Sequence, residues 1–216
     1  MYLIYIALFS YLLGSVPFSY LVAKLYGKNI QEIGSKNVGA ANVYRATGKI
    51  DALILAIIGD GGKGALAIFL VQKFGFLGYN LFLAQAIAAF FIVLGHNWPL
   101  FLLFRGGRGL ASLVGVIAYL NWKIIILVAL VVSLVILLTE LIMKKKIKLN
   151  GSLKEKLKQL LLILISQVFG RVIGILVAAI LVYILYPQTF KIIFAAVILA
   201  GLKHVKRTQT FLADQK

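Results

Sequence analysis

Three polar motifs interrupt this chain, and their residue types suit the binding of an anion such as phosphate. The first motif reads GSKNVGAANVYR and spans residues 34–45. Its glycines, Gly34 and Gly39, allow positive φ, so backbone N–H groups can converge on an anion. The other polar side chains supply neutral donors and positive charge, and they are Ser35, Lys36, Asn37, Asn42 and Arg45. A phosphate cradle and a hydrated connection between two helices both fit this stretch taken alone.

The second motif reads GHNWPLFLLFRGGRG and spans residues 95–109. It ends in interleaved cations and glycines, which are Arg105, Gly106, Gly107, Arg108 and Gly109. Arginine presents a planar fork of donors that matches phosphate oxygens, and the glycines let the backbone approach the same ligand. A helix that begins at Leu110 would also direct its N-terminus toward an anion. The third motif is short, KHVKR at residues 203–207, and contains His204.

Two charged residues, Asp60 and Lys63, lie inside an apolar stretch, where a charge needs a partner or a cavity. Their spacing of three residues allows them to pair on a helix. A structural ion pair and a role in supporting the site are both open at this point. His96 is expected to form hydrogen bonds or cap a helix rather than act as a base. Trp98 is typical of a membrane interface.

The sequence excludes several catalytic chemistries. It contains no cysteine, which removes thiol nucleophiles, disulfides and cysteine-ligated metals. It also lacks an HExxH motif, a GxSxG elbow, a GxxxxGK[ST] loop and a histidine followed five residues later by aspartate. No metal and no cofactor are therefore expected. A site rich in anion binders and poor in bases suits a substrate with an activated leaving group, where positioning and charge stabilisation supply most of the catalysis.

The elements that position these motifs are predicted to be membrane-spanning helices. Of the 216 residues, 62% are hydrophobic and 13% are charged, with a mean hydropathy of +1.01. Soluble domains contain only about 45–50% apolar residues. Pro17 is expected to kink the first helix, which we expect to be retained rather than cleaved. The spanning part of the sixth stretch is expected to begin near Arg171. The apolar stretches that predict helices run over 2–23, 52–74, 79–93, 110–120, 124–143, 160–186 and 190–202.

The charge distribution predicts how these helices are oriented. The net charge is +17, and 19 of the 23 Lys and Arg residues fall after the first, third and fifth stretches, at the start of the sixth, or in the C-terminal tail. The positive-inside rule then predicts seven transmembrane helices, with the N-terminus outside and the C-terminus cytoplasmic. All three motifs would face the cytoplasm. We predict a single polytopic membrane domain, residues 1–216, with a basic cytoplasmic insertion at about 144–158 and no nucleic-acid partner.

Taken together, the motifs resemble those of the bacterial membrane glycerol-3-phosphate acyltransferases that use acyl phosphate, the PlsY type. The segments that carry the resemblance read LLGSVPFSYLVAK, GSKNVGAANVYRATGK and GHNWPLFLLFRGGRGLAS, together with Asp60, Lys63-Gly64 and the C-terminal His204. Their order and spacing match over about Leu12 to Ser112, half of the chain. The seven-span topology of that family, with its N-terminus outside, is similar to the topology that the charges predict.

The resemblance implies an acyltransferase of phospholipid biosynthesis in the cell (plasma or inner) membrane. An acyl phosphate would donate its acyl group to the 1-hydroxyl of sn-glycerol 3-phosphate, giving lysophosphatidic acid and phosphate. Both substrates and membrane lipid would be its partners. Catalytic roles fall on Ser35, Arg45, Arg105 and His204. Substrate or phosphate binding falls on Gly34, Asn37, Gly39, Asn42, Gly106, Gly107, Arg108 and Gly109. Supporting roles fall on Asp60, Lys63, His96 and Asn97.

The chain also departs from the usual pattern of that family. Lys36, Val38 and Ala41 replace glycine, proline and threonine in the first motif, and arginine replaces lysine in the second. In the third, Arg207 stands where asparagine is expected, and residues 170–174 lack an expected serine. A divergent paralogue that acylates another phosphorylated acceptor is therefore an alternative. An organic-phosphate transporter is another, although its polar groups should face both sides, and the predicted outer connections are short and weakly polar.

Overall fold

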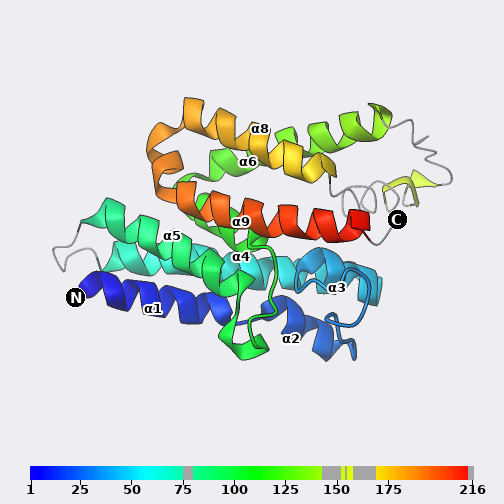
Figure 1. Cartoon of the computed structure of the whole chain (residues 1–216), viewed down its shortest axis with the longest axis horizontal. Helices are drawn as coiled ribbons and strands as arrows, with labels where there is room; N and C mark the ends of the chain where they lie inside the picture. Colours follow the sequence, from blue (N-terminus) through cyan, green and yellow to red (C-terminus); the bar gives the residue numbers. More distant parts are fainter. Residues whose placement is uncertain (75–79, 143–151, 154, 158–168, 214–216) are drawn as a thin grey trace.

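The computed structural model describes residues 1–74, 80–142, 152–153, 155–157 and 169–213. The elements of this part are helices, which confirms the all-α class (Figure 1). Most of the predicted insertion at 144–158 lies outside these described residues. The elements are α1 (Tyr2–Ser15), α2 (Phe18–Leu25), α3 (Ala40–Thr47), α4 (Ile50–Lys73), α5 (Leu81–Asn97), the 3-10 turn η2 (Leu100–Leu102), α6 (Leu110–Ile142), α8 (Phe169–Leu185) and α9 (Pro187–Ala213).

The first predicted span is divided at its proline. The helix α1 ends at Ser15, and α2 begins at Phe18 directly after Pro17. Proline has no N–H to donate and its ring collides with the preceding turn, so the predicted distortion at Pro17 is confirmed as a break. The break leaves the carbonyl groups at the end of α1 without helical partners, and these carbonyls contribute to the candidate site described below.

Small residues let the helices approach one another closely. A Cβ atom at Gly14 of α1 would overlap the carbonyl oxygen of Ile92 on α5. In the same way, a Cβ atom at Gly64 of α4 would overlap the carbonyl oxygen of Ser112, near the start of α6. Such backbone contacts are typical of membrane helices, where packing rather than exclusion of water holds neighbours together. They fix α1, α4, α5 and the first turns of α6 relative to one another.

The helix α6 contains a sharp irregularity at Asn121, where the backbone leaves the helical region with φ −162° and ψ 96°. Asn121 therefore divides α6 into two arms, and Figure 1 shows that they do not continue along one axis. The sequence predicts separate helices over 110–120 and 124–143, and a break between two helices at Asn121 is confirmed, while their crossing of the membrane as two spans stays a prediction. The second arm packs on α8, where a Cβ atom at Gly174 would lie 3.0 Å from the Cα atom of Val132.

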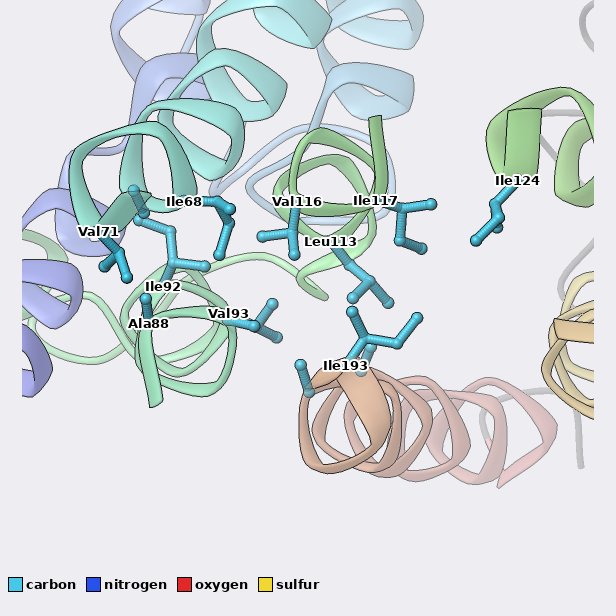
Figure 2. Close-up of a cluster of buried hydrophobic side chains, with 14 of the residues drawn as sticks. Ile68, Val71, Ala88, Ile92, Val93, Leu113, Val116, Ile117, Ile124 and Ile193 are labelled. Atoms are coloured by element: carbon cyan, nitrogen blue, oxygen red, sulfur yellow. The ribbon is translucent and has the colours of Figure 1, made fainter. Parts of the chain in front are cut away.

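The core lies between α4, α5, α6 and α9 (Figure 2). Each of these helices contributes β-branched or small residues that are almost fully buried. Side chains of this kind pack densely in well-defined rotamers, so the core holds the four helices in fixed register. The labelled members in Figure 2 are Ile68, Val71, Ala88, Ile92, Val93, Leu113, Val116, Ile117, Ile124 and Ile193.

Two polar motifs are more helical than the sequence indicated. The second half of the first motif forms α3, which begins after Gly39 and ends at Gly48, where φ is +67°. Glycine is the usual residue at such a left-handed helix end. The segment described from sequence as a tail after Leu202 instead continues α9 to Ala213. This follows from its residues, because lysine, arginine and glutamine favour helix and no glycine or proline intervenes.

Four helical stretches of the described chain are long and apolar enough to cross a membrane. They are Tyr2–Leu25, Ile50–Lys73, Leu81–Leu102 and Leu110–Thr139, and a shorter apolar helix covers Val172–Leu185. Many large apolar side chains on these helices point outward, as lipid contact requires. The chain is thus built as a multi-pass integral membrane protein.

Candidate active site

Asn42 fixes the shape of the first glycine motif. Its side chain on α3 is buried, and its Oδ1 accepts a hydrogen bond of 3.0 Å from the backbone N–H of Ser35. Its Nδ2 donates to the carbonyl oxygens of Ile30 and Ile33, at 2.8 and 3.0 Å. An asparagine amide has two donor hydrogens, so both are used inside the loop. Asn42 therefore stabilises the loop that precedes α3, while its predicted contact with phosphate stays a prediction.

Both glycines of this motif lie close to asparagine side chains, and Gly34 also has a positive φ. Gly34 has φ +58°, and a Cβ atom there would lie 2.7 Å from Oδ1 of Asn42. At Gly39, the N-cap of α3, a Cβ atom would lie 3.0 Å from Nδ2 of Asn37. The side chain of Asn37 thus lies beside the N-terminus of α3, an end that favours negative charge. This local geometry suits the anion cradle that the sequence predicts.

Arg45 lies on α3 one turn after Asn42 and is half-buried. Its Cβ atom is 3.8 Å from the position that a Cβ atom of residue 34 would occupy. Burial lowers the pKa of the Arg45 guanidinium below its usual value. Arginine nevertheless stays protonated at neutral pH, so a residue whose Cβ atom lies near Gly34 carries a permanent positive charge.

The second glycine motif packs against both the end of α5 and the first motif. The backbone N–H of Gly107 donates to the carbonyl oxygen of His96 at 3.0 Å. A Cβ atom at Gly107 would overlap Nε2 of His96 and the carbonyl oxygen of Val38. The side chain of Gln31 also reaches across, since its Nε2 donates to the carbonyl oxygen of Arg105 at 3.2 Å. Val38 and Gly107, which are 69 residues apart in the sequence, therefore bring the two motifs into direct contact.

The remaining glycines of the second motif are equally confined. A Cβ atom at Gly106 would overlap the His96 carbonyl oxygen and Cδ of Pro99. Gly109 has φ +75°, and a Cβ atom there would lie 2.8 Å from Oδ1 of Asn97. Arg105 is exposed and Arg108 is half-buried. The loop therefore carries two arginines on a segment that contacts the first motif, while its backbone rests on α5.

The predicted pair of Asp60 and Lys63 is an ion pair at the centre of a buried polar cluster. The Lys63 Nζ lies 3.1 Å from Oδ1 of Asp60, and it donates to the carbonyl oxygens of Gly14 and Val16 at 2.7 Å each. An ammonium group has three hydrogens, and here three oxygen atoms surround it. Lys63 thus binds the carbonyl groups that the break before Pro17 leaves free of helical partners.

The carboxylate of Asp60 joins a second and a third helix to this cluster. Ser19 of α2 donates its hydroxyl hydrogen to Oδ2 of Asp60 at 2.5 Å, and Nδ1 of His96 on α5 lies 3.4 Å from Oδ1. All of these side chains are buried. The ion-pair prediction is confirmed, and the supporting interpretation remains compatible with it because His96 also contacts Gly107. His96 is buried and engaged with Asp60, as expected for a hydrogen-bonding residue.

Lys203 of the third motif connects α9 to the same region, although sequence reasoning assigned it no role of its own. Its Nζ donates to the carbonyl oxygen of Asn97 at 3.0 Å and lies 4.4 Å from the ring centroid of Trp98. Nδ2 of Asn97 lies 3.4 Å from the carbonyl oxygen of Leu199. A signal was present in the sequence, since Lys203 follows the buried Ala196 and Ala200 at helical spacing.

His204 is the next residue on α9, and its side chain lies outside the described part of the structure. Its predicted role therefore stays a prediction. Gln31 and Ser19 were also missed, because a polar residue near a loop or a helix break gives no signal of its distant partner. Of the predicted residues that are described, all lie on the two motifs or in the cluster beneath them.

The fold and this geometry define an integral membrane protein in which two basic, glycine-rich segments contact each other beside a buried ion pair. The family profile described as glycerol-3-phosphate acyltransferase matches residues 4–214, and the chain belongs to that family. A similar solved structure is the crystal structure of PlsY (YgiH), an integral membrane glycerol 3-phosphate acyltransferase, in its glycerol 3-phosphate form. It is 25% identical, with a TM-score of 0.70, and the match covers 99% of this chain and 91% of that one.

Curated relatives match a little more than half of the chain. A glycerol-3-phosphate acyltransferase of Jannaschia sp. (strain CCS1) is 44% identical over 119 residues, which are 55% of this chain and 56% of that protein. One from Janthinobacterium sp. (strain Marseille) is 44% identical over 117 residues, 53% of this chain and 57% of that protein. The matched stretch thus spans little more than half the length of these relatives.

Proposed function

We propose that this protein transfers a fatty acyl group from an acyl phosphate to the 1-hydroxyl of sn-glycerol 3-phosphate. The products are lysophosphatidic acid and inorganic phosphate. Membership of the glycerol-3-phosphate acyltransferase family supports the reaction class.

The contact between the two glycine motifs is the observation that carries this proposal. Val38 and Gly107 meet, and Gln31 binds the backbone at Arg105. Arginines from both segments could therefore bind the two substrates together, because acyl phosphate and glycerol 3-phosphate each carry a negatively charged phosphate group. Arginine forks and glycine backbones are suited to holding two such groups in reacting distance.

The chemistry requires little from a protein base. The acceptor oxygen forms a bond to the acyl carbon, and the bond from that carbon to the phosphate oxygen breaks. Phosphate leaves with the electron pair, and the hydroxyl proton is taken up by a substrate phosphate oxygen. Arg45 and Arg105 would stabilise the negative charge that develops on the carbonyl and leaving oxygens. Ser35 and Asn37 would orient the bound phosphates, and no covalent acyl-enzyme forms.

The proposed topology places this site at the cytoplasmic face. Seven helices would span the membrane, with the N-terminus outside, and the basic residues on the cytoplasmic side would face anionic lipid and substrates. The alternation of charge between successive connections supports this arrangement. Water-soluble glycerol 3-phosphate would then reach the site from the cytoplasm, while the acyl donor would arrive through the bilayer.

The purified protein in bilayers, supplied with acyl phosphate and glycerol 3-phosphate, tests the proposal through release of phosphate and formation of lysophosphatidic acid. Arg45→Ala should lower kcat by on the order of 10²-fold, as for loss of a charge-stabilising donor. Lys145→Ala, in the basic stretch, serves as the cation control and should leave activity nearly unchanged. No product with acyl phosphate, acyl-CoA or acyl-carrier protein would contradict the acyltransferase assignment.

Two further results would change the details. If the protein turned over only a different phosphorylated acceptor, that acceptor and not glycerol 3-phosphate would be its substrate. If His204→Ala abolished turnover while substrate binding stayed intact, proton transfer to a substrate phosphate would be replaced by base catalysis at His204.

A further inference from the structure

The segment between α5 and the second glycine motif exposes an unusual run of large apolar side chains. Leu103 is 81% exposed and Phe104 is 53% exposed. Leu100 and Phe101, in the η2 turn before them, are also exposed. We call residues 100–104 the apolar loop. It ends directly at Arg105, so whatever covers this loop lies beside the candidate site.

The backbone of the apolar loop is held in a conformation that these residues rarely adopt. Leu103 has φ +49° and Phe104 has φ +64°, two successive residues in the left-handed region. A side chain with a Cβ atom is strained there, and the strain is larger for bulky residues than for glycine or asparagine. Strained backbone of this kind persists where the surroundings or the function require it. Here it directs two large apolar side chains outward.

The backbone donors at 102–105, in the second half of the loop and directly after it, are paired locally. The N–H of Leu102 donates to Pro99, that of Leu103 to Leu100, and that of Phe104 again to Pro99, at 3.2, 3.2 and 2.9 Å. The N–H of Arg105 donates to the carbonyl oxygen of Leu102 at 3.0 Å. Irregular backbone is costly in hydrocarbon because unpaired N–H groups have no water to bind. Each donor that is paired locally in this way lowers the cost of placing the exposed apolar side chains in hydrocarbon.

The surroundings of the apolar loop indicate what covers it. The apolar composition of α5 continues into the loop, since the stretch long and apolar enough to cross a membrane runs from Leu81 to Leu102. Trp98 precedes the loop and Arg105 follows it. Tryptophan prefers the level of the lipid head groups, and a long cationic side chain can extend its charge from that level toward water. These flanks are typical of a segment at the membrane interface.

We propose that the apolar loop is inserted among the acyl chains of the leaflet on the side of the candidate site. The inserted Leu103 and Phe104 hold the second glycine motif at the depth where a lipid-borne acyl phosphate presents its head group. The effect of the loop on activity rests on the proposed function, whereas its insertion into the membrane does not. Lipid acyl chains cover the apolar loop in this proposal, and the alternative is that a second copy of the chain covers it.

Insertion can be measured directly because the natural chain has no cysteine. Leu103→Cys, labelled with an environment-sensitive fluorophore, should show blue-shifted emission in vesicles and quenching by lipids with a nitroxide on the upper acyl chain. Leu130→Cys, on the outward face of α6, is the control for lipid contact, and Lys28→Cys, on an exposed loop, is the control for water. Emission at position 103 like that at position 28 would overturn the proposal. So would efficient cross-linking of Leu103→Cys into dimers, which would identify a second copy as the occupant.

The consequence for substrate use is tested with two donors that differ only in chain length. Leu103→Ser should raise KM for a long-chain acyl phosphate by on the order of tenfold, comparable to the transfer of one large apolar side chain. KM for a short, water-soluble acyl phosphate and for glycerol 3-phosphate should not change. Leu130→Ser is the matched control and should leave both donors unaffected.

Replacement by glycine separates the side chain from the backbone. Leu103→Gly relaxes the positive φ but removes the apolar group, so it should fold at least as well while showing the same donor-specific rise in KM. Equal rises in KM for both donors would overturn the donor-positioning role. If neither donor is used by the unsubstituted protein, the proposed function fails, and the fluorescence result alone decides whether the loop is inserted.

Discussion

Replacing Gly107 with alanine should separate the two glycine motifs. The added methyl group would overlap the backbone carbonyl oxygen of Val38 and the ring of His96. Neither neighbour can turn aside easily, because one is main chain and the other is a buried ring engaged with Asp60. To restore ordinary contact the segments must part by about 1 Å, and a misplacement of that size costs on the order of 10²-fold in rate. Overpacking should also lower the free energy of unfolding by about 1–3 kcal/mol.

The assay compares Gly107→Ala with Gly62→Ala. Gly62 lies on α4, and a Cβ atom there would meet nothing within 4 Å, so this control should retain activity. In a helix the same change is favourable by about 0.5–1 kcal/mol. Phosphate release under saturating substrates and thermal unfolding in detergent give the two readouts. If Gly107→Ala were as active and as stable as the control, contact between the motifs would not be what organises the site.

Three further substitutions test the supporting contacts. Asp60→Asn should destabilise the protein by about 3–5 kcal/mol, since it leaves the buried ammonium of Lys63 without its carboxylate. The temperature of thermal unfolding should return largely to its original value in the double variant Asp60→Leu, Lys63→Met. If it did not, loss of the ion pair would not be the cause. Lys203→Met should speed hydrogen exchange at the C-terminal end of α9 through loss of a charged hydrogen bond worth about 1.5–3 kcal/mol. Lys203→Arg should keep most of the protection, and equal exchange in both variants would refute this. Asn42→Ala should release the loop at 27–39 at a cost of about 1–3 kcal/mol for each buried group left unpaired, and unchanged proteolysis of that loop would contradict its role as the brace.

Several structural features could be predicted because their causes are local in sequence. Pro17 breaks the first span since its own ring forbids a continuous helix. Asp60 and Lys63 pair since three residues along a helix place them on one face. The connection at Asn121 separates two helices as the interruption of apolar residues indicated. In each case the deciding interaction lies within one helical turn.

Other features depend on partners far along the chain. The sequence does not show that the donors of Asn42 are spent on Ile30 and Ile33, because asparagine in a glycine-rich loop could equally face a ligand. It does not select Lys203 either, whose acceptor at Asn97 is 106 residues away. Side-chain partners at such separations are decided by helix packing, which residue periodicity constrains only weakly.

By itself, the sequence determined that this chain is a helical membrane protein with basic, glycine-containing motifs of the glycerol-3-phosphate acyltransferase family. Apolar length and residue type suffice for that, since hydrocarbon accepts only backbone that pairs its own polar groups. The tertiary structure alone decided that the first two motifs touch at Val38 and Gly107, and that Lys63 binds the open end of α1. Close backbone approach and the pairing of buried charges depend on distances in space, which fold and packing set together.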